Sequence, residues 1–358
     1  MPHGNDELSK AANVVLTKRS GINHFGHRVR AVLLAPAPSC YGSGMKLMLL
    51  LSPLAKGAFF ADAIDVAAAE LMAVCPVEGD VVEQGGLTFF RVDADKRQVR
   101  QLARLSFVQG IFEDTGDGLH IVDADPNFLL HEDLVYGAKY RGKTNELMTQ
   151  LALNVALAHC HTDAMKKGKP LSLLDPMAGR GTTLLWALRY GLNAKGVEVD
   201  RAAPDDLHRH IKKQSKLHKI KHQHQSGVVG TRKDSKGTYQ HYTFGDVSLR
   251  LLTGDAQKTP TLVAQQKFDL VVSDLPYGVQ FKGQKERSPF SVVERCAKGW
   301  VASMREGASL VLVFNSYQPK RDDLIGLFEH HGLDAQPFEA PHRMSESIVR
   351  DVVVFQKP

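Results

Sequence analysis

The sequence predicts an α/β fold with a mostly parallel sheet and helices on both of its faces, preceded by a small α+β domain. From residue 171 onward, short apolar segments typical of strands alternate with helix-like segments. This order is typical of a parallel sheet whose crossovers are helices. Before it, residues 46–122 contain a shorter series of strand-like and helix-like pieces. We therefore expect one small domain followed by a larger one.

Length and composition agree with a globular protein of two domains. The chain has 358 residues, of which 43% are apolar and 7% aromatic, values usual for water-soluble proteins. No apolar run approaches the roughly 20 residues of a membrane helix, so we expect no membrane partner. The four cysteines are scattered and form no C-x-x-C pair. This pattern favours reduced thiols and a cytoplasmic location, and it argues against a zinc ribbon.

The expected elements of the first domain fall within residues 45–135. We expect strands at 46–52, 87–92, 106–112 and 119–122, and helices at 61–74 and 95–105. No chemistry is recognisable among these residues, and the polar stretch from 123 onward resembles a connector. Residues 1–44 lack clear periodicity, which fits either a disordered leader or a translation start placed too early.

The expected elements of the second domain fall within residues 136–358. Thr144 or Asn145 can cap a helix that runs to about 161, with Glu146 in its first turn. We expect one helix at 183–190 and another that begins at about 204. The expected strands are 171–174, 194–199, 249–252, 268–272, 309–314 and 351–356.

A glycine-rich turn follows the first strand of the second domain, with the sequence Asp175-Pro-Met-Ala-Gly-Arg-Gly-Thr-Thr183. Gly179 and Gly181 let the backbone pass close to a ligand, and the next helix offers free N–H groups at its start. Ligands of open α/β sheets bind at the carboxyl ends of the strands. A bare G-x-G is weak evidence, since it also serves turn geometry alone. The third glycine of the dinucleotide fingerprint is missing.

An acid follows the second strand, about twenty residues after the turn, where acids accept both hydroxyls of a ribose. Glu198 occupies this position, and Asp200 is the competing candidate. Either acid could instead only cap the next helix.

The catalytic candidate is Ser273-Asp-Leu-Pro-Tyr-Gly278, at the end of the strand at 268–272. An exocyclic base amine is a poor nucleophile because its lone pair is delocalised into the ring. Two acceptors at its hydrogens favour a pyramidal nitrogen and stabilise the developing positive charge. Asp274 supplies one acceptor; Pro276 forces Leu275 out of the α region, so that its carbonyl supplies the other. Tyr277 can stack on the base, although a strand-ending turn with a buried tyrosine is the structural alternative.

Together, the two segments resemble motifs I and IV of S-adenosylmethionine-dependent methyltransferases that act on exocyclic base amines. The form D-L-P-Y-G and the segment Tyr140-Arg-Gly-Lys-Thr-Asn-Glu146 resemble tRNA guanine-N2 methyltransferases that carry a THUMP domain, including the Trm-G10 and Trm-eleven groups. The resemblance covers about residues 136–358 and implies a Rossmann-like methyltransferase fold. The first domain has the place and size of a THUMP-like RNA-binding region, but its residues do not establish one.

The resemblance also implies roles for individual residues. Asp175 would lie near the methionine moiety of the cofactor, Glu198 would bind its ribose, and Asp255 of Leu252-Thr-Gly-Asp-Ala256 would accept from its adenine amine. Arg180 departs from the small hydroxylated residue common between the glycines of this family. The cofactor-binding set is Thr144, Asp175, Pro176, Ala178, Gly179, Gly181, Glu198, Asp255 and Ala256. The resemblance requires neither a metal nor a covalent enzyme intermediate.

The positive charge of the chain is concentrated in one segment. Residues 208–241 hold nine Lys/Arg and one acid, whereas the other residues hold 36 Lys/Arg and 38 acids. This segment lies in a predicted insertion at 208–244, where 220–244 resembles a hairpin. We interpret it as a contact for nucleic-acid backbone, with a solvated loop as the alternative. The predicted contacts are Arg209, Lys212, Lys213, Lys216, Lys219 and Lys221. Two His-x-His pairs, at 208–210 and 222–224, lack a nearby cysteine and are not expected to bind metal.

The sequence therefore predicts methyl transfer to the N2 amine of guanine in structured RNA, most plausibly tRNA. Guanine presents two neighbouring donors, at N1 and N2, to one carboxylate, whereas adenine presents an acceptor at N1. The alternatives are an adenine-N6 methyltransferase acting on DNA or RNA, and a module that binds RNA without modifying it. A third alternative, which the resemblance suggests, is a subunit that needs a small partner for activity.

Overall fold

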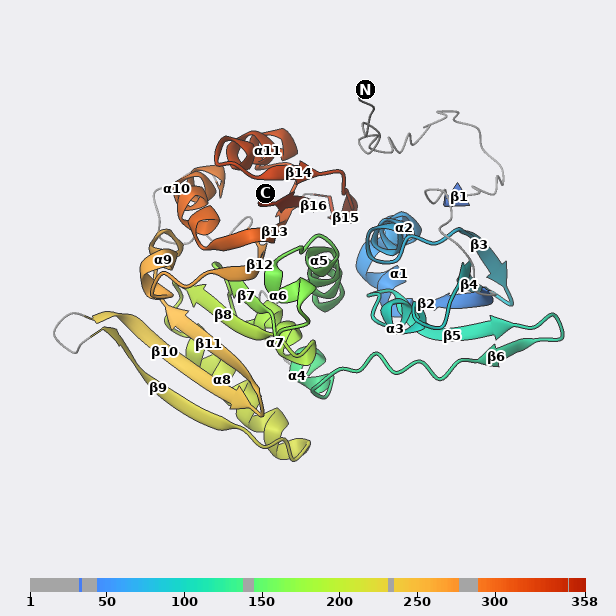
Figure 1. The fold of residues 1–358 in the computed structure, drawn as a ribbon, viewed down its shortest axis with the longest axis horizontal. Helices are drawn as coiled ribbons and strands as arrows, with labels where there is room; N and C mark the ends of the chain where they lie inside the picture. Colours follow the sequence, from blue (N-terminus) through green and yellow to red (C-terminus); the bar gives the residue numbers. More distant parts are fainter. Residues whose placement is uncertain (1–31, 34–43, 138–144, 231–234, 277–288, 347) are drawn as a thin grey trace, which may run out of the picture.

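The computed structural model describes residues 32–33, 44–137, 145–230, 235–276, 289–346 and 348–358, which form two β-sheets with associated helices (Figure 1). The elements before the larger sheet are β1 (Val32–Leu33), β2 (Met45–Leu51), α1 (Pro53–Phe59), a 3-10 turn (Phe60–Asp62), α2 (Ala63–Val74), β3 (Gly79–Gln84), β4 (Leu87–Ala94), α3 (Val99–Ala103), β5 (Val108–Asp114), β6 (Leu119–Ile121) and α4 (Asp133–Tyr136). The strands form an antiparallel sheet in the order β1-β3-β4-β2-β5-β6.

The remaining elements build the larger, ten-stranded sheet and its helices. They are α5 (Glu146–Ala158), α6 (Asp163–Lys166), β7 (Ser172–Asp175), α7 (Thr182–Arg189), β8 (Asn193–Glu198), α8 (Ala203–Leu217), β9 (Gln223–Gly230), β10 (Ser235–Phe244), β11 (Val247–Thr253), a 3-10 turn (Ala256–Lys258), α9 (Thr259–Leu262), β12 (Phe268–Asp274), α10 (Pro289–Ala302), β13 (Met304–Asn315), α11 (Arg321–His330), β14 (Asp334–Gln336), β15 (His342–Ser345) and β16 (Ile348–Gln356).

The centre of this sheet is parallel, in the order β13-β12-β7-β8-β11. Antiparallel strands extend it at both ends, with β16, β14 and β15 beyond β13, and β10 and β9 beyond β11. The predicted α/β fold with parallel strands is thus confirmed. The predicted hairpin in the basic segment is confirmed as β9 and β10.

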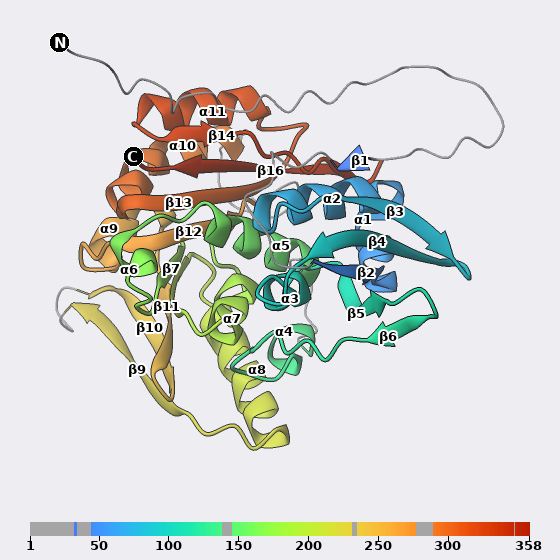
Figure 2. The same ribbon diagram turned by 45° about the vertical axis from the view of Figure 1, so that its right-hand side comes forward.

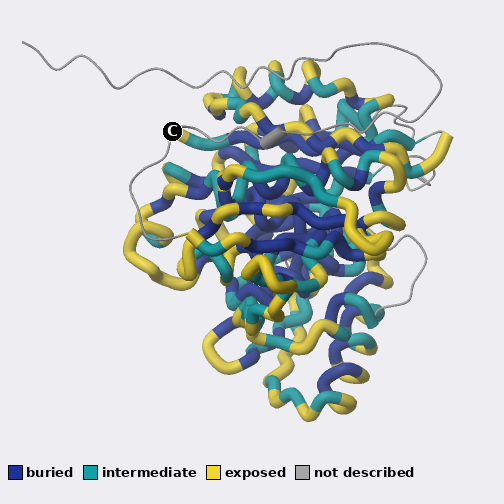
Figure 3. Tube along the Cα trace, turned by 90° about the vertical axis from the view of Figure 1, so that its right-hand side faces the viewer, coloured by how far each residue is buried: buried dark blue, intermediate teal, exposed yellow. Residues whose placement is uncertain are grey.

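Two hydrophobic clusters cover the two faces of the sheet. The first includes residues of α5, α7 and α8, and the second includes residues of α10 and α11. Buried residues fill the centre of the molecule and exposed ones follow its outer turns (Figure 3). Since both faces of the parallel strands are covered, these strands are near-continuous apolar runs.

Helix α5 begins where the sequence places a cap. The side chain of Asn145 accepts from the backbone N–H groups of Leu147 (3.0 Å) and Met148 (3.1 Å). Two of the four free N–H groups at the helix start are thereby satisfied.

Three features of the first domain were predicted wrongly or missed. The expected helix at 95–105 is only Val99–Ala103, and helix α1 and strand β3 were not expected. Strand β3 has no fully buried residue, so it lacks the apolar alternation on which strand prediction depends.

The antiparallel sheet packs through its helices against α5 of the larger sheet (Figure 2). One hydrophobic cluster runs from Leu47 through Leu71 to Leu151 and Leu173. Buried Glu70 of α2 accepts from the side chain of Asn154 on α5 (2.6 Å) and from the backbone N–H of Ser106 (3.0 Å). The two sheets therefore share a continuous core.

Within the described residues, the helices are all too short or too polar to span a lipid bilayer.

Candidate functional site

The acids singled out in the sequence lie at one edge of the larger sheet. Asp175, Glu198 and Asp274 are the last residues of β7, β8 and β12, and Asp255 lies just after β11. These four strands are neighbours in the order β12-β7-β8-β11. Because they are parallel, their carboxyl ends share one edge, which is where open α/β sheets bind ligands.

The glycine turn lies next to Glu198. Gly179 and Gly181 have φ angles of +51° and +85°, a region that favours glycine. The N–H of Gly179 donates to Oε2 of Glu198 (2.7 Å). Apart from its two chain neighbours, none of the described residues has a heavy atom within 4 Å of an ideal Cβ position at Gly179, so a side chain there would extend into space that these residues leave open. Gly181 precedes the first turn of α7, whose free N–H groups point toward the same edge.

Glu198 and Asp200, the two candidates for the ribose acid, have different surroundings. Asp200 is paired with Arg180 at 2.6 Å, and its Oδ1 accepts from the N–H of Ala202 (2.9 Å). Arg180 also pairs with Asp206 on α8 at 2.6 Å. Among the residues that the structure describes, Glu198 accepts only from backbone N–H groups, those of Gly179 and of Asp200 (2.7 Å). Arg180 thus bonds the competing acid, and the carboxylate of Glu198 retains acceptor capacity.

Asp175 is directed into the protein. It is 2% exposed and accepts from Ser273 Oγ (2.8 Å) and from the N–H of Met177 (3.1 Å). Burial raises the pKa of its carboxyl group to about 7, against hydrogen bonds from Ser273, Thr183 and Met177 that lower it. Asp175 therefore ties the end of β7 to β12 and shapes the turn that follows. Pro176 and Ala178 are buried beside it.

Asp255 bonds the backbone of the turn that follows it. Its Oδ1 accepts from the N–H of Gln257 (2.9 Å), so it caps the short turn that contains Ala256. The N–H of Gly254 donates to the carbonyl of Glu198 (2.8 Å), which joins the ends of β11 and β8. Asp255 and Ala256 are both half-buried at this edge.

Asp274 is held by an arginine that the sequence analysis missed. Nη2 of Arg350, on β16, donates to Oδ1 of Asp274, and the arginine side chain is 1% exposed while that of Asp274 is 13% exposed. The N–H of Leu275 donates to the carbonyl of Val313 (2.8 Å), which fixes the chain as it leaves β12. In the sequence, Arg350 could have been noticed as a charged residue beside the apolar run of the last strand, β16.

Two predicted site residues, Thr144 and Tyr277, lie outside the described residues, as does most of the predicted leader at 1–44. Leu275 is buried and Pro276 half-buried.

The six predicted nucleic-acid contacts are exposed and follow α8 and the loop after it. Helix α8 starts after Glu198, at the carboxyl edge. Its chain then enters β9 at Gln223, which pairs with Thr243 near the beginning of β11. The helix thus runs from the carboxyl edge toward the amino edge of the sheet. Arg209 lies in the middle of α8 and pairs with Asp206, whereas Lys216, Lys219 and Lys221 lie near the amino edge.

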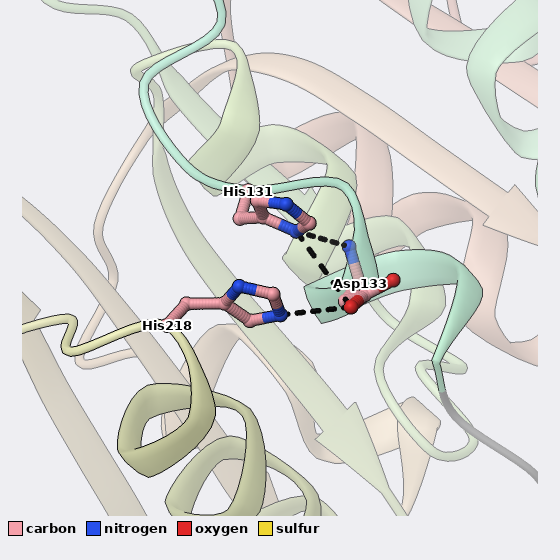
Figure 4. A group of neighbouring side chains, drawn as sticks. All are labelled: His131, Asp133 and His218. Carbon is pink, nitrogen blue, oxygen red and sulfur yellow. Dashed lines mark hydrogen bonds and ion pairs between the residues drawn. The ribbon is translucent and has the colours of Figure 1, made fainter.

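A cluster of titratable side chains joins the connector to the end of α8 (Figure 4). His131, Asp133 and His218 offer ligand atoms within 4.8 Å of one another. Nε2 of His218 lies 2.8 Å from Oδ2 of Asp133, the N–H of Asp133 donates to Nδ1 of His131 (3.2 Å), and the two imidazole rings stack at 3.7 Å. The three side chains thereby bond one another. They carry donor types that bind zinc, so the absence of a metal stays a prediction.

The two histidines of the first His-x-His pair lie within hydrogen-bond distance of other residues. His208 Nδ1 lies 3.0 Å from the hydroxyl of Tyr242, and His210 Nε2 lies 2.7 Å from the carbonyl of Leu134.

Residues 141–322 match the model of the UPF0020 family, described as the RMKL-like, methyltransferase domain. No curated protein matches the chain. Among solved structures, TrmN from Thermus thermophilus is similar, with 15% identity over 79% of this chain and a TM-score of 0.41. The chain spans 60% of the length of that protein.

Two further solved structures are similar. A methyltransferase from Pyrococcus furiosus has 13% identity over 63% of this chain and 92% of its own, with a TM-score of 0.37. An S-adenosylmethionine-dependent methyltransferase from Agrobacterium tumefaciens has 13% identity over 61% of this chain and 64% of its own, with a TM-score of 0.41.

Proposed function

The chain belongs to the UPF0020 family of RMKL-like methyltransferase domains. We therefore propose that it methylates the N2 amine of a guanine in structured RNA, with tRNA as the substrate. The methyltransferase prediction is confirmed by this membership, and with it the cofactor S-adenosylmethionine. The observation that carries the finer proposal is the carboxylate of Asp274, held by buried Arg350 at the same sheet edge as the glycine turn and Glu198.

The residues at this edge fit the cofactor. The open space over Gly179 leaves room for a ligand against the backbone, and Glu198 next to it can accept from ribose hydroxyls. Half-buried Asp255 can accept from an adenine amine. When bound, S-adenosylmethionine supplies an electrophilic methyl group on a sulfonium.

Asp274 would hold and activate the amine. Arg350 bonds Oδ1, and no hydrogen-bond partner of Oδ2 occurs among the described residues. Oδ2 is therefore the oxygen that can accept from the amine. The carbonyl of Leu275 is the second acceptor, because Pro276 keeps Leu275 extended. Both acceptors stabilise positive charge on nitrogen as the new N–C bond forms and until its proton is lost.

Guanine in RNA is favoured by two features of the chain. A carboxylate suits the adjacent N1 and N2 donors of guanine better than the N1 acceptor of adenine. The exposed cations of α8 and the following loop suit a phosphate backbone. A cytoplasmic location fits the buried, free thiols of Cys75, Cys160 and Cys296.

The test is to incubate the protein with labelled S-adenosylmethionine and either total RNA or genomic DNA, and to analyse the nucleosides by mass spectrometry. We expect N2-methylguanosine from RNA. N6-methyladenosine would reject the proposed base, and label in DNA alone would reject RNA.

Asp274→Ala is the matched variant for this assay. It should lower the transfer rate by about 10²–10³-fold, since it removes one preorganised acceptor. Calorimetry should show nearly unchanged affinity for S-adenosylmethionine. A variant that keeps most of its single-turnover rate would show that Asp274 is not the key acceptor.

A further inference from the structure

Two cationic side chains and a histidine form a row across three neighbouring strands of the larger sheet. Arg250 on β11 is paired in register with Lys195 on β8 and with His241 on β10. Side chains directly opposite one another on parallel or antiparallel neighbours lie close together, and like charges in such positions destabilise a sheet. This row therefore has an energetic cost unless an anion lies against it.

The row lines a cavity of about 670 Å³ at the amino edge of the sheet. Ser172, Asn193 and Phe268, near or at the starts of their strands, contribute to the same cavity. The side chains that bring positive charge to it are Lys167, Lys169, Lys195, Arg250 and Arg305, with His241 beside them.

The two carboxylates of the cavity already have partners. Asp163 pairs with Lys167 at 3.0 Å. Asp269 accepts from the N–H of Ser172 (2.9 Å) and lies 3.5 Å from Arg305. No carboxylate of the described residues lies within ion-pair distance of Lys195 or Arg250. The positive charge of the row is thus uncompensated among these residues.

The side chains of the row are partly withdrawn from water. Nε of Arg250 and Nδ1 of His241 are buried and have no hydrogen-bond partner among the described residues. The guanidinium of Arg250 lies 3.9 Å from the ring centre of Tyr239, and Lys195 donates to the side chain of Gln266. Burial and the charge of Arg250 both lower the pKa of Lys195, and burial, Arg250 and Lys195 lower that of His241. An anion in the cavity would relieve this repulsion.

We propose that this cavity binds a backbone phosphate of the RNA substrate, at the edge of the sheet opposite the methyl-transfer site. The proposal rests on the proposed function for the identity of the anion. The first and last residues of β8 are five steps of about 3.3 Å apart, so roughly 17 Å separates the two edges. Lys195 and Arg250 alternate along their strands with Ala194, Leu249 and Leu251, which belong to the hydrophobic cluster of α8, so they face the side of the sheet opposite that helix. A structured RNA that spans both edges would place a phosphate in the cavity while its target base enters the catalytic edge.

The first experiment uses inorganic pyrophosphate as the probe and thermal unfolding as the readout. At low salt, pyrophosphate should raise the Tm of the wild type in a concentration-dependent manner. The Tm of the double variant Lys195→Met/Arg250→Met should rise much less. Lys298→Met, at an exposed site on α10, is the control that should respond like the wild type. Without added anion, Lys195→Met should unfold at the same or a higher temperature than the wild type, since repulsion is relieved. A clearly lower Tm, or no effect of pyrophosphate on the wild type, would overturn the proposal.

The second experiment measures binding of bulk tRNA at several salt concentrations. The slope of log affinity against log salt should fall by about 0.7–0.9 in the double variant, the value for one phosphate contact. Arg250→Lys, which keeps the charge, should retain most of the slope. If the double variant folds poorly, the single variant Lys195→Met replaces it, and its slope should fall by about half as much. An unchanged slope despite a pyrophosphate effect would reject RNA as the ligand. The pyrophosphate assay is independent of methylation, so failure of the proposed activity would be distinguishable from failure of this site.

Discussion

At the scale of single residues, the candidate site depends on how each carboxylate is bonded. Glu198 holds the glycine turn through the N–H of Gly179, whereas Asp200 is bonded by Arg180. Glu198 as the ribose acid stays a prediction, and the pairing of Asp200 with Arg180 makes the two acids distinguishable by mutation.

Replacing Glu198 by alanine should weaken S-adenosylmethionine binding by about 1.5–3 kcal/mol, the usual contribution of a hydrogen bond to a charged group. Isothermal titration calorimetry measures this change. Asp200→Ala is the matched control and should have a smaller effect, because its carboxylate is paired with Arg180. A larger effect of Asp200→Ala would assign the ribose to Asp200 instead, and tight binding of NAD would reject the cofactor role of the turn.

Arg350 should act as a positioning residue for Asp274. Arg350→Met removes the donor to Oδ1 and frees the carboxylate to rotate, so single-turnover transfer should slow by about 100-fold, a loss typical of misplaced catalytic groups. Arg350→Lys should restore part of the rate. Cofactor affinity should stay close to that of the wild type in both variants.

Loss of a buried charge partner also destabilises proteins, so thermal unfolding must show that the Arg350 variants are folded at the assay temperature. A folded Arg350→Met with a normal rate would limit Arg350 to a structural role.

At the scale of elements, α8 and the β9–β10 hairpin extend the parallel sheet and carry the positive charge. The helix runs from the catalytic edge toward the opposite edge, so its lysines lie progressively farther from Asp274. The sequence predicts that the basic segment contacts nucleic-acid backbone. The structure distributes this segment along one side of the sheet, where an extended RNA would be needed to contact both ends.

Neutralising Lys212, Lys213 and Lys216 together should weaken RNA binding and flatten its salt dependence. The slope of log affinity against log salt should fall by about 0.7–0.9 per contacted charge. Cofactor affinity should not change, because these side chains are exposed on α8, away from the glycine turn. Filter binding at several salt concentrations gives the slope. An unchanged slope would fit a solvated helix face and remove these lysines from the RNA contact.

At the scale of the whole molecule, buried Glu70 links the two sheets. It accepts from Ser106 and from Asn154, and Tyr190 donates to the same Asn154 (2.6 Å). Burial raises the pKa of Glu70 to about 7, although these hydrogen bonds lower it. Its pKa in the folded protein therefore lies above that in the unfolded chain.

This shift predicts a loss of stability as pH rises. The contribution is fully present below about pH 4.5, the ordinary pKa, and is lost as pH rises through about 7. Glu70→Gln should flatten the dependence of the free energy of unfolding on pH between 5 and 8, by up to about 1.4 kcal/mol per pH unit for one proton. Urea denaturation at several pH values measures it. The raised pKa of Asp175 acts in the same direction and remains in this variant. Parallel pH curves for the two proteins would contradict the role of Glu70.

Local sequence patterns were sufficient to predict the parallel core of the larger sheet, the glycine turn, and the acids that end β7, β8 and β12. Apolar strands buried on both faces and glycines at positive φ can be recognised within a few residues. Which acids remain available at the edge, and which bond inward as Asp175 does, became visible in the folded chain alone. Folding also brought Arg350 to Asp274 and aligned Lys195 with Arg250. These pairings join strands far apart in the chain, and their register follows from the packing of the whole sheet.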